Sequence, residues 1–365
     1  MRQSYPQEES ENLSYPSGTL IGTAEDVTKA PRETTRREKG SCFIVPKSLE
    51  ICAGAGGTAI GLERAGFSHV GLVENDPHAC ATLRHNRPEW NVVEADVRLV
   101  KAEEFAKFDL LSGGVPCPPF SKAGRQLGAD DERDLFPEVV RLAEEARPKA
   151  IIVENVRGLL DPIFSDYRKR VQKDLENIGY WSEFKMLNAS DYGVPQLRPR
   201  VILVGLAHQF ADRFTWPVPG ASAAPTVGEA LYEEMSRAGW PGAADWRDIA
   251  CTVAPTLVGG SKKHGGPDLG PTRARQAWAK LGVEGRTIAN EPPGPDHEGL
   301  PRLTVKMAAV LQGFPPDWEI VGRKTQAYRQ IGNAFPPPIA EAVARSIKKA
   351  IRVNRKAKTE ADAAA

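Results

Sequence analysis

Short apolar segments alternate with helix-like patterns along the first half of this 365-residue chain. Four apolar segments have the length of strands: residues 48–52, 69–74, 108–111 and 150–154. Four helical patterns fall between or after them: residues 58–65, 77–86, 135–146 and 167–178. Strands that are apolar along nearly their whole length, and that are joined by helices, are typical of a parallel sheet covered on both faces. We therefore predict an α/β fold with helices on both faces of the sheet.

Two further apolar segments, residues 181–187 and 201–206, flank a polar loop rich in turn residues. We expect them to form an antiparallel pair that completes the sheet, which would then be mixed. After about Phe214 the sequence changes, and residues 256–290 contain seven glycines and little hydrophobic periodicity. The basic side chains there outnumber the acidic ones by four. A regular pattern resumes around residues 303–311 and 339–351.

These changes predict five regions. Residues 1–41 form a disordered N-terminal extension, because they contain few large apolar side chains. A large α/β domain covers residues 42–214, and a small irregular basic domain covers residues 215–300. Residues 301–352 return to the first domain, and residues 353–365 form a disordered tail.

The composition excludes several classes of protein. With 41% hydrophobic and 26% charged residues the chain is expected to be globular, and no apolar segment approaches the roughly 20 residues that span a bilayer. The N-terminal segment lacks the apolar core of a signal peptide, so we expect a cytoplasmic protein. Five widely spaced cysteines without a C-x-x-C pair argue against a disulfide framework and against a zinc site. The net charge of +1 does not by itself indicate a nucleic-acid partner.

A glycine-rich loop follows the first predicted strand and leads directly into a helix. It contains Gly54, Gly56 and Gly57, and glycines at the carboxyl end of a strand let a cofactor approach the backbone. Glu74 ends the next strand, where a carboxylate can accept hydrogen bonds from both hydroxyls of a ribose. Asp96 follows the third and could accept from an adenine amino group. The alternative is a tight turn without a ligand, but three such features at successive strand ends favour an adenosine site.

Cys117 lies between prolines on a glycine-flanked loop after the fourth predicted strand. This position favours an exposed and reactive thiol over the alternative, a buried structural cysteine. Glu154 ends the fifth strand and is expected to face the same crevice, although it could instead cap the next helix. The two side chains together suggest a catalytic site at this edge of the sheet.

In the same order along the chain, these segments and three later ones resemble the signature motifs of the DNA (cytosine-5) methyltransferase family. The early matches are Gly54–Gly57 to the cofactor loop, Glu74 and Asp96 to its acidic partners, Pro116-Cys117 to the nucleophile motif and Glu154-Asn155-Val156 to the motif of the catalytic glutamate. The later matches are residues 196–200 to Q-x-R-x-R, residues 302–304 with 311–315 to the motif after the recognition region, and residues 330–334 with Pro336-Pro337 to the last motif. The resemblance covers roughly residues 48–350.

The resemblance implies a class I methyltransferase fold, which is Rossmann-like, with the basic domain serving as a target-recognition domain. The cofactor would be S-adenosylmethionine, which becomes S-adenosylhomocysteine, and no metal would be needed. The residues expected to bind the cofactor are Cys52, Ala53, Gly54, Gly56, Gly57, Glu74, Asn75, Asp96, Val97, Pro116 and Asn333.

By the same resemblance, Cys117 is the nucleophile. Its thiolate would add to C6 of cytosine and make C5 nucleophilic, while Glu154 would hold a proton on N3. Arg200 would lie near the cytosine and Arg198 would support the loop, although both could instead pair with phosphate or surface charges. A base inside a duplex cannot reach the thiol, so the cytosine would be flipped out.

The expected partner is double-stranded DNA. The residues expected to contact it are Ser121, Gln196, Lys262, Lys263, Arg273 and Arg275. The alternative for the basic segment is a solvated loop. The resemblance further implies a modification enzyme of a restriction–modification or similar defence system. We expect a monomer that acts beside a cognate restriction endonuclease without forming a stable complex.

The chain departs from the family pattern at three places, none of which removes a group needed for the chemistry. Cys52 stands where the family often has Phe, so stacking on the adenine would be weaker. Pro118 follows the nucleophile where Gln is common, and Lys306-Met307 stand where Arg-Glu is usual.

Three other functions remain as alternatives. A tRNA cytosine-5 methyltransferase of the same fold is disfavoured because a recognition region as long as 215–300 is more typical of DNA enzymes. An amino-group methyltransferase is disfavoured because a cysteine in the Cys117-Pro-Pro-Phe loop accepts hydrogen bonds poorly. A catalytically silent DNA-binding regulator is disfavoured because Cys117, Glu154 and Arg200 are all present.

Overall fold

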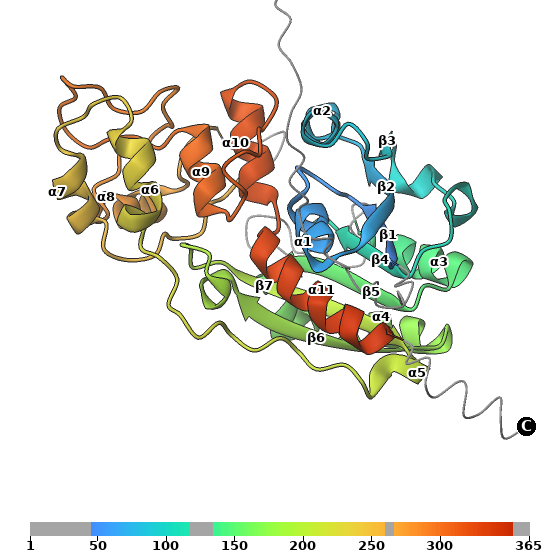
Figure 1. Ribbon diagram of the computed structural model, residues 1–365. Coiled ribbons are helices and arrows are strands. Elements are labelled where there is room, and N and C mark those ends of the chain that lie inside the picture. Colours follow the sequence, from blue (N-terminus) through green and yellow to red (C-terminus); the bar gives the residue numbers. More distant parts are fainter. Residues whose placement is uncertain (1–44, 117–133, 260–265, 353–365) are drawn as a thin grey trace, which may run out of the picture. The chain divides into compact units, whose positions relative to one another are not determined.

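The computed structural model describes residues 45–116, 134–259 and 266–352, and these contain a seven-stranded sheet of order β3-β2-β1-β4-β5-β7-β6 (Figure 1). The strands are β1 Lys47–Ile51, β2 Ser68–Glu74, β3 Val92–Glu94, β4 Leu110–Gly114, β5 Ala150–Val156, β6 Tyr180–Asn188 and β7 Pro199–Ala207. The first five are parallel, and β7 runs antiparallel to both β5 and β6. The mixed sheet predicted from the apolar segments is confirmed. The extension and the tail expected at the two ends lie outside the described residues.

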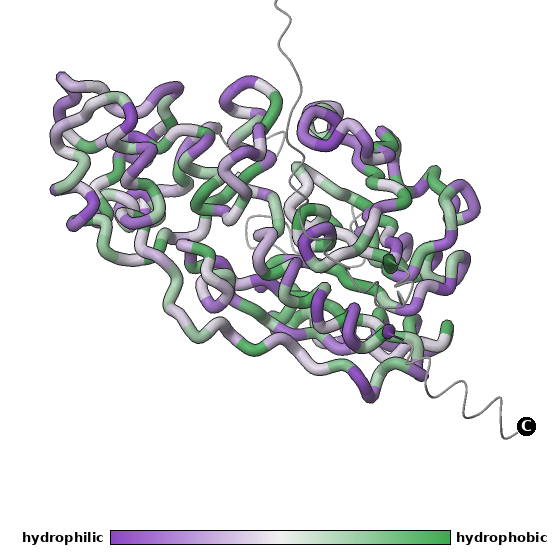
Figure 2. Tube along the Cα trace, in the orientation of Figure 1, coloured by the Kyte–Doolittle hydropathy of each residue, from purple (hydrophilic) through white to green (hydrophobic). Residues whose placement is uncertain are grey.

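Helices cover both faces of this sheet. They include α1 Gly57–Ala65, α2 Pro77–Asn86, α3 Phe136–Ala146, α4 Ser165–Asn177, α5 His208–Ala211 and α11 Pro337–Ile351. Successive side chains of β5 face opposite helix layers. Ile152 packs in the cluster of α1 and α11, whereas Ile151 and Val153 pack in the cluster of α3 and α4. In Figure 2 hydrophilic and hydrophobic residues alternate along the trace of helix α11 within each turn, as expected for a helix with one buried face.

Strand β4 extends further than the sequence predicted and includes both Gly113 and Gly114. A β-carbon on Gly113 would lie 2.8 Å from Cγ1 of Ile51 on the neighbouring strand, so any other residue would require Ile51 or its strand to shift. The glycines that were interpreted as part of a loop are therefore strand residues. They carry the chain to the edge of the sheet immediately before Pro116.

The predicted domain of residues 215–300 is less irregular than expected. It contains the helices α6 Val227–Ser236, α7 Ala243–Ile249 and α8 Thr272–Ala279. Helix α6 begins with a capping box, in which Glu229 N donates to Thr226 Oγ1 and Thr226 N donates to Glu229 Oε2. This Thr-x-x-Glu pattern is readable in the sequence and was overlooked. The three short helices were not predicted, and the rest of the described part of residues 215–300 is irregular, as expected.

The three helices share one hydrophobic cluster with the segment that follows them. Leu231 of α6, Trp246 of α7 and Trp278 of α8 are buried in the same cluster as Met307 of α9 and Tyr328 of α10. Helix α9 comprises Val305–Leu311 and α10 comprises Lys324–Asn333.

The 3₁₀ helices among the described residues are Val97–Leu99, Ala102–Glu104, Arg157–Leu160, Pro162–Phe164 and Ala189–Tyr192. In the described part of the chain, no helix combines the length and apolarity needed to cross a membrane.

Candidate active site at the carboxyl edge of the sheet

Three of the expected site residues lie at or near the carboxyl ends of strands in the parallel part of the sheet: Cys52, Glu74 and Glu154. Glu74 is the last residue of β2, Cys52 follows β1, and Gly114 ends β4, where it pairs with Glu154 of β5. A β-carbon on Gly114 would lie 3.7 Å from Oε2 of Glu154 and 3.6 Å from the carbonyl oxygen of Cys52. The missing side chain therefore leaves room beside the Glu154 carboxyl. Pro116, two residues later, is half-buried and precedes Cys117; Cys117 and Ser121 lie outside the described residues.

Glu154 and Arg200 form a buried ion pair, with 2.7 Å between Oε1 and Nε. Arg200 lies on β7 opposite Val156, so the antiparallel register brings its side chain to the end of β5. Burial raises the pKa of Glu154, and the nearby positive charges of Arg200 and Arg198 only partly oppose this effect. A carboxyl in this environment can carry a proton closer to neutral pH than an exposed one and give it to a bound base.

Glu74 is held by three backbone amides of the loops around it. Gly54 N donates to Oε2 at 2.7 Å, and the amides of Asn75 and Asp76 donate to Oε1 at 2.8 Å each. Burial raises the pKa of Glu74, although these three hydrogen bonds favour the ionised form. The carboxylate is thus fixed in orientation, and Oε2, which accepts from a single amide, keeps a lone pair for a further donor such as a ribose hydroxyl. A β-carbon on Gly54 would meet nothing within 4 Å, so the space beside the loop is open.

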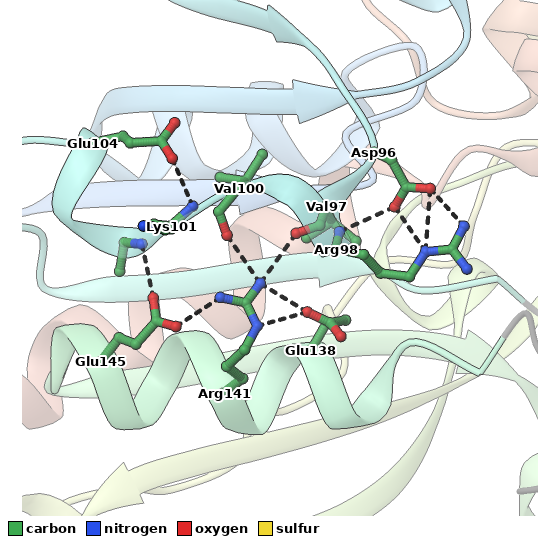
Figure 3. Close-up of polar contacts among 10 residues, drawn as sticks. Asp96, Val97, Arg98, Val100, Lys101, Glu104, Glu138, Arg141 and Glu145 are labelled. Carbon is green, nitrogen blue, oxygen red and sulfur yellow. Dashed lines mark hydrogen bonds and ion pairs between the residues drawn. The ribbon is translucent and has the colours of Figure 1, made fainter.

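Asp96 follows β3 and is paired with Arg98 (Figure 3). Nε of Arg98 donates to Oδ1 at 3.0 Å and to Oδ2 at 3.1 Å, and these hydrogen bonds lower the pKa of Asp96. Arg141 of α3 supports the same segment from below, because its Nη2 donates to the carbonyls of Val97 and Val100. The sequence interpretation missed both arginines. An arginine two residues after the acid was a signal for Arg98, whereas Arg141 had none.

The other residues expected to bind the cofactor lie in or beside the glycine-rich loop. Cys52 has a left-handed backbone, with φ of 51°, and burial beside Glu74 and Asp96 raises the pKa of its thiol. Asn333, at the end of α10, is exposed, and the carbonyl oxygen of Phe335 lies 2.0 Å from where a β-carbon of Gly57 would be. The end of α10 therefore crosses directly over the start of α1. Ala53 and Gly56 lie in the glycine-rich loop between β1 and α1.

Gln196 lies in a different environment from the one expected of a DNA contact. Its side chain is fully buried, and Nε2 donates to the carbonyl of Leu311 at 2.9 Å and to Oε1 of Gln312 at 3.0 Å. Its Oε1 accepts from Leu257 N at 3.0 Å. Both ends of the amide are therefore used inside the protein, and in this structure the side chain is not presented to DNA, contrary to the expectation. The residue instead positions the segment around Leu257.

Arg198 is also fully buried, and its guanidinium donates hydrogen bonds to the segment around Leu257 and to the end of α10. Nη1 donates to the carbonyl of Leu257 at 2.7 Å, and Nη2 donates to the carbonyls of Gly332 at 2.6 Å and Ala334 at 3.0 Å. It therefore joins the start of β7 to residues 215–300 and to the end of α10. This geometry accords with the supporting role that the resemblance implied.

Comparison with known proteins gives the family. The model of the family described as C-5 cytosine-specific DNA methylase matches residues 47–349 of this chain. The chain belongs to this family. It is a DNA (cytosine-5) methyltransferase of the restriction–modification type, so the resemblance predicted from the motifs is confirmed.

Two type II methyltransferases are more than half identical to it. M.NgoMIV of Neisseria gonorrhoeae is 54% identical over 312 residues, which are 84% of this chain and 98% of that protein. M.NaeI of Lentzea aerocolonigenes is 53% identical over 311 residues, which are 84% of this chain and 75% of that protein.

Solved structures show the same fold at low sequence identity. A DNA modification methyltransferase encoded within an E. coli prophage has a TM-score of 0.59 and 23% identity, with 83% of this chain and 98% of that chain covered. A mutant of Spodoptera frugiperda DNMT2 has a TM-score of 0.56 and 16% identity, with 84% of this chain and all of that chain covered. The class I methyltransferase fold is therefore shown.

Two of the four basic residues expected to contact DNA lie in the described part of the methyltransferase. Arg273 is exposed and Arg275 half-buried on α8, where Nη2 of Arg275 donates to Thr272 Oγ1 at 3.2 Å. Lys262 and Lys263 lie outside the described residues.

In the described part of the chain, no group of three or more His, Cys, Asp or Glu side chains is arranged to hold a metal ion.

Replacing Arg198 by Lys should destabilise the methyltransferase, because a single ammonium cannot reproduce the planar fork that serves Leu257, Gly332 and Ala334. We expect the free energy of unfolding to fall by about 3 kcal/mol, as for other buried charge-assisted hydrogen bonds. Urea unfolding measures it. The matched control is Arg213→Lys, at an exposed arginine that makes one 3.4 Å hydrogen bond to the carbonyl of Arg352. Equal losses in the two variants would contradict the assigned role.

Proposed function

We propose that this methyltransferase transfers a methyl group from S-adenosylmethionine to C5 of a cytosine flipped out of duplex DNA, through a covalent bond between Cys117 and C6. The observation that carries the proposal is the buried Glu154–Arg200 pair beside the room left by Gly114. This pair lies at the strand end that leads through Pro116 to Cys117. A proton donor, a cation and a thiol at one edge of the sheet are the groups that this chemistry requires.

The proton on Glu154 explains how the ring is activated. Addition of the Cys117 thiolate to C6 forms a carbon–sulfur bond and pushes electron density into the ring. Glu154 gives its proton to N3 and so offsets the negative charge that would develop there. C5 then becomes nucleophilic and takes the methyl group. A base such as water removes the C5 proton, the C5–C6 double bond re-forms as the thiolate leaves, and N3 returns its proton to Glu154. Arg200 keeps the carboxyl in place and stabilises its anionic form once the proton has moved.

The residues around the glycine-rich loop fit S-adenosylmethionine, which would supply an electrophilic methyl group bound to sulfur. The amide-held carboxylate of Glu74 suits a ribose hydroxyl, which would donate to the remaining lone pair of Oε2. Asp96, kept ionised by Arg98, suits the amino group of adenine. The open space beside Gly54 suits close approach of the methionine part to the backbone.

The remaining parts of the proposal concern the partners. Residues 42–214 with 301–352 would form the catalytic domain and residues 215–300 the target-recognition domain, with Arg273 and Arg275 at the DNA. Ser121, Lys262 and Lys263 would add contacts. We propose a monomer that acts in the cytoplasm beside a cognate restriction endonuclease, without a stable complex between them.

The covalent intermediate can be trapped. Duplex DNA with 5-fluorocytosine at the target, identified by bisulfite sequencing, should form a denaturation-resistant adduct when S-adenosylmethionine is present. The enzyme remains attached because fluorine cannot leave C5 as a cation. A gel shift measures the adduct. Cys117→Ser should give no adduct and no methylation while still binding the cofactor, because a hydroxyl is a far weaker nucleophile. Clean release of the fluorinated DNA by active wild-type enzyme would overturn the covalent mechanism.

Replacing Glu154 by Gln should lower kcat by about 100-fold, because the amide cannot supply a proton. The active form of Glu154 is protonated, and burial raises its pKa. Wild-type activity should therefore be present below this pKa and decline as the pH rises through it. The alkaline decline should be absent from the variant, since an amide does not titrate. An identical decline in both enzymes would assign it to another group.

Replacing Arg273 and Arg275 by Ala should weaken DNA binding and reduce its salt dependence. Each lost phosphate contact should lower the slope of log K against log salt concentration by about 0.9, because fewer counterions are released. Lys169 and Lys173, exposed on α4, provide the control pair. Affinity for S-adenosylmethionine should not change in either variant. An unchanged slope in the arginine variant would place the DNA interface elsewhere.

A further inference from the structure

Trp318 donates a hydrogen bond to the glycine-rich loop from a segment more than 200 residues away in sequence. Its indole Nε1 donates to the carbonyl oxygen of Ala55 at 3.1 Å, and the side chain is only 5% exposed. Ala55 lies between Gly54 and Gly56, which both have positive φ, at 54° and 90°. A peptide flanked by two such glycines has many alternative conformations, so fixing it costs conformational entropy.

The ring of Trp318 also occupies the space beside this loop. A β-carbon on Gly56 would lie 2.9 Å from Cζ2 of the indole and 2.8 Å from Cδ2 of Leu83. The loop is therefore in van der Waals contact with the ring on one side. Gly54 N donates to Oε2 of Glu74. These two hydrogen bonds, from Gly54 N and to Ala55 O, hold consecutive residues of the loop in one conformation.

The segment that carries Trp318 is itself firmly attached to α2. Asn86 Nδ2 donates to the carbonyl of Glu319 at 2.7 Å, and Glu319 N donates to Asn86 Oδ1 at 2.8 Å. Val321 N donates to Thr82 Oγ1 at 3.0 Å. The guanidinium of Arg87 lies 5.4 Å from the centroid of the Trp318 ring. Trp318 thus reaches the loop from a rigid support.

We propose that Trp318 is a positioning residue for the cofactor, which shapes the glycine-rich loop before S-adenosylmethionine binds. The inference rests on the proposed cofactor site and adds a residue outside it. A loop that is already ordered loses less entropy when a ligand binds, so its affinity is higher. The effect is expected on cofactor affinity and not on the chemical step, because the contacts that Trp318 makes within the described residues are with the glycine-rich loop and with its own support, and not with the Glu154–Arg200 pair.

Replacing Trp318 by Phe removes the indole N–H and keeps an aromatic ring. We expect the Kd for S-adenosylhomocysteine, measured by calorimetry on the full chain, to rise by about 2- to 12-fold, the effect of one lost neutral hydrogen bond. The KM for S-adenosylmethionine should rise in parallel, and kcat at saturation should stay within about twofold of wild type. Without ligand, the amides of residues 53–58 should exchange with deuterium faster than in wild type.

Trp90→Phe is the matched control. Its ring lies 5.9 Å from that of Trp318 in the same aromatic group, so the substitution is chemically identical and close in space. Cofactor affinity should change less than about twofold. Asn86→Leu is a second variant, which frees the support of Trp318 and leaves the loop and the ring intact. It should weaken cofactor binding in the same direction, and it keeps the proposal testable if Trp318→Phe does not fold.

The outcomes separate two failures. If the folded wild-type protein binds neither S-adenosylmethionine nor S-adenosylhomocysteine, the proposed function fails. If wild type binds them and the Trp318 and Asn86 variants bind equally well, the positioning role is wrong. A fall in kcat of Trp318→Phe at saturating cofactor, without a change in Kd, would also overturn it.

Discussion

The buried guanidinium of Arg198 connects parts of the methyltransferase that are up to 136 residues apart in sequence. Its hydrogen bonds reach Leu257 in the predicted recognition region and Gly332 and Ala334 at the end of α10. Buried carbonyls in irregular segments and at helix ends need partners, because leaving them unpaired costs free energy. One planar cation with several donors meets this need at the place where three segments converge. The active-site strand β7 begins immediately beyond it, so the position of Arg200 depends on this junction.

The two buried carboxyls at the edge of the sheet differ because their partners differ. Burial raises the pKa of both. Glu74 is surrounded by backbone amides, which donate to the ionised form and leave one lone pair, on Oε2, for a hydroxyl group. Glu154 faces a guanidinium and the space beside Gly114, which suits a group that holds a proton and then stabilises its loss. The same side-chain type can therefore serve cofactor binding at one strand end and proton transfer at another.

The sequence carried least information about side chains whose environment depends on distant segments. Gln196 was expected to contact DNA, yet its amide is fully buried and bonded to Leu311, Gln312 and Leu257. A polar residue can be buried at little cost when all its hydrogen bonds are made, and those partners come from segments distant in sequence. The helices of residues 215–300 were missed for a related reason. Their apolar residues complete a cluster shared with α9 and α10, so short helices there need no strong periodicity of their own.

The sequence by itself determined the sheet, its helices and the edge at which the site lies. Apolar strands must be buried on both faces, and the carboxyl ends of parallel strands meet at one edge, so Glu74 and Glu154 could be placed from order alone. The motifs also identified the family. Only the tertiary structure decided which side chains support the site. The contacts of Arg198 and Trp318 are made with backbone carbonyls, and a carbonyl is the same in every residue. No local pattern can indicate which distant donor it will meet, because that depends on how the whole chain packs.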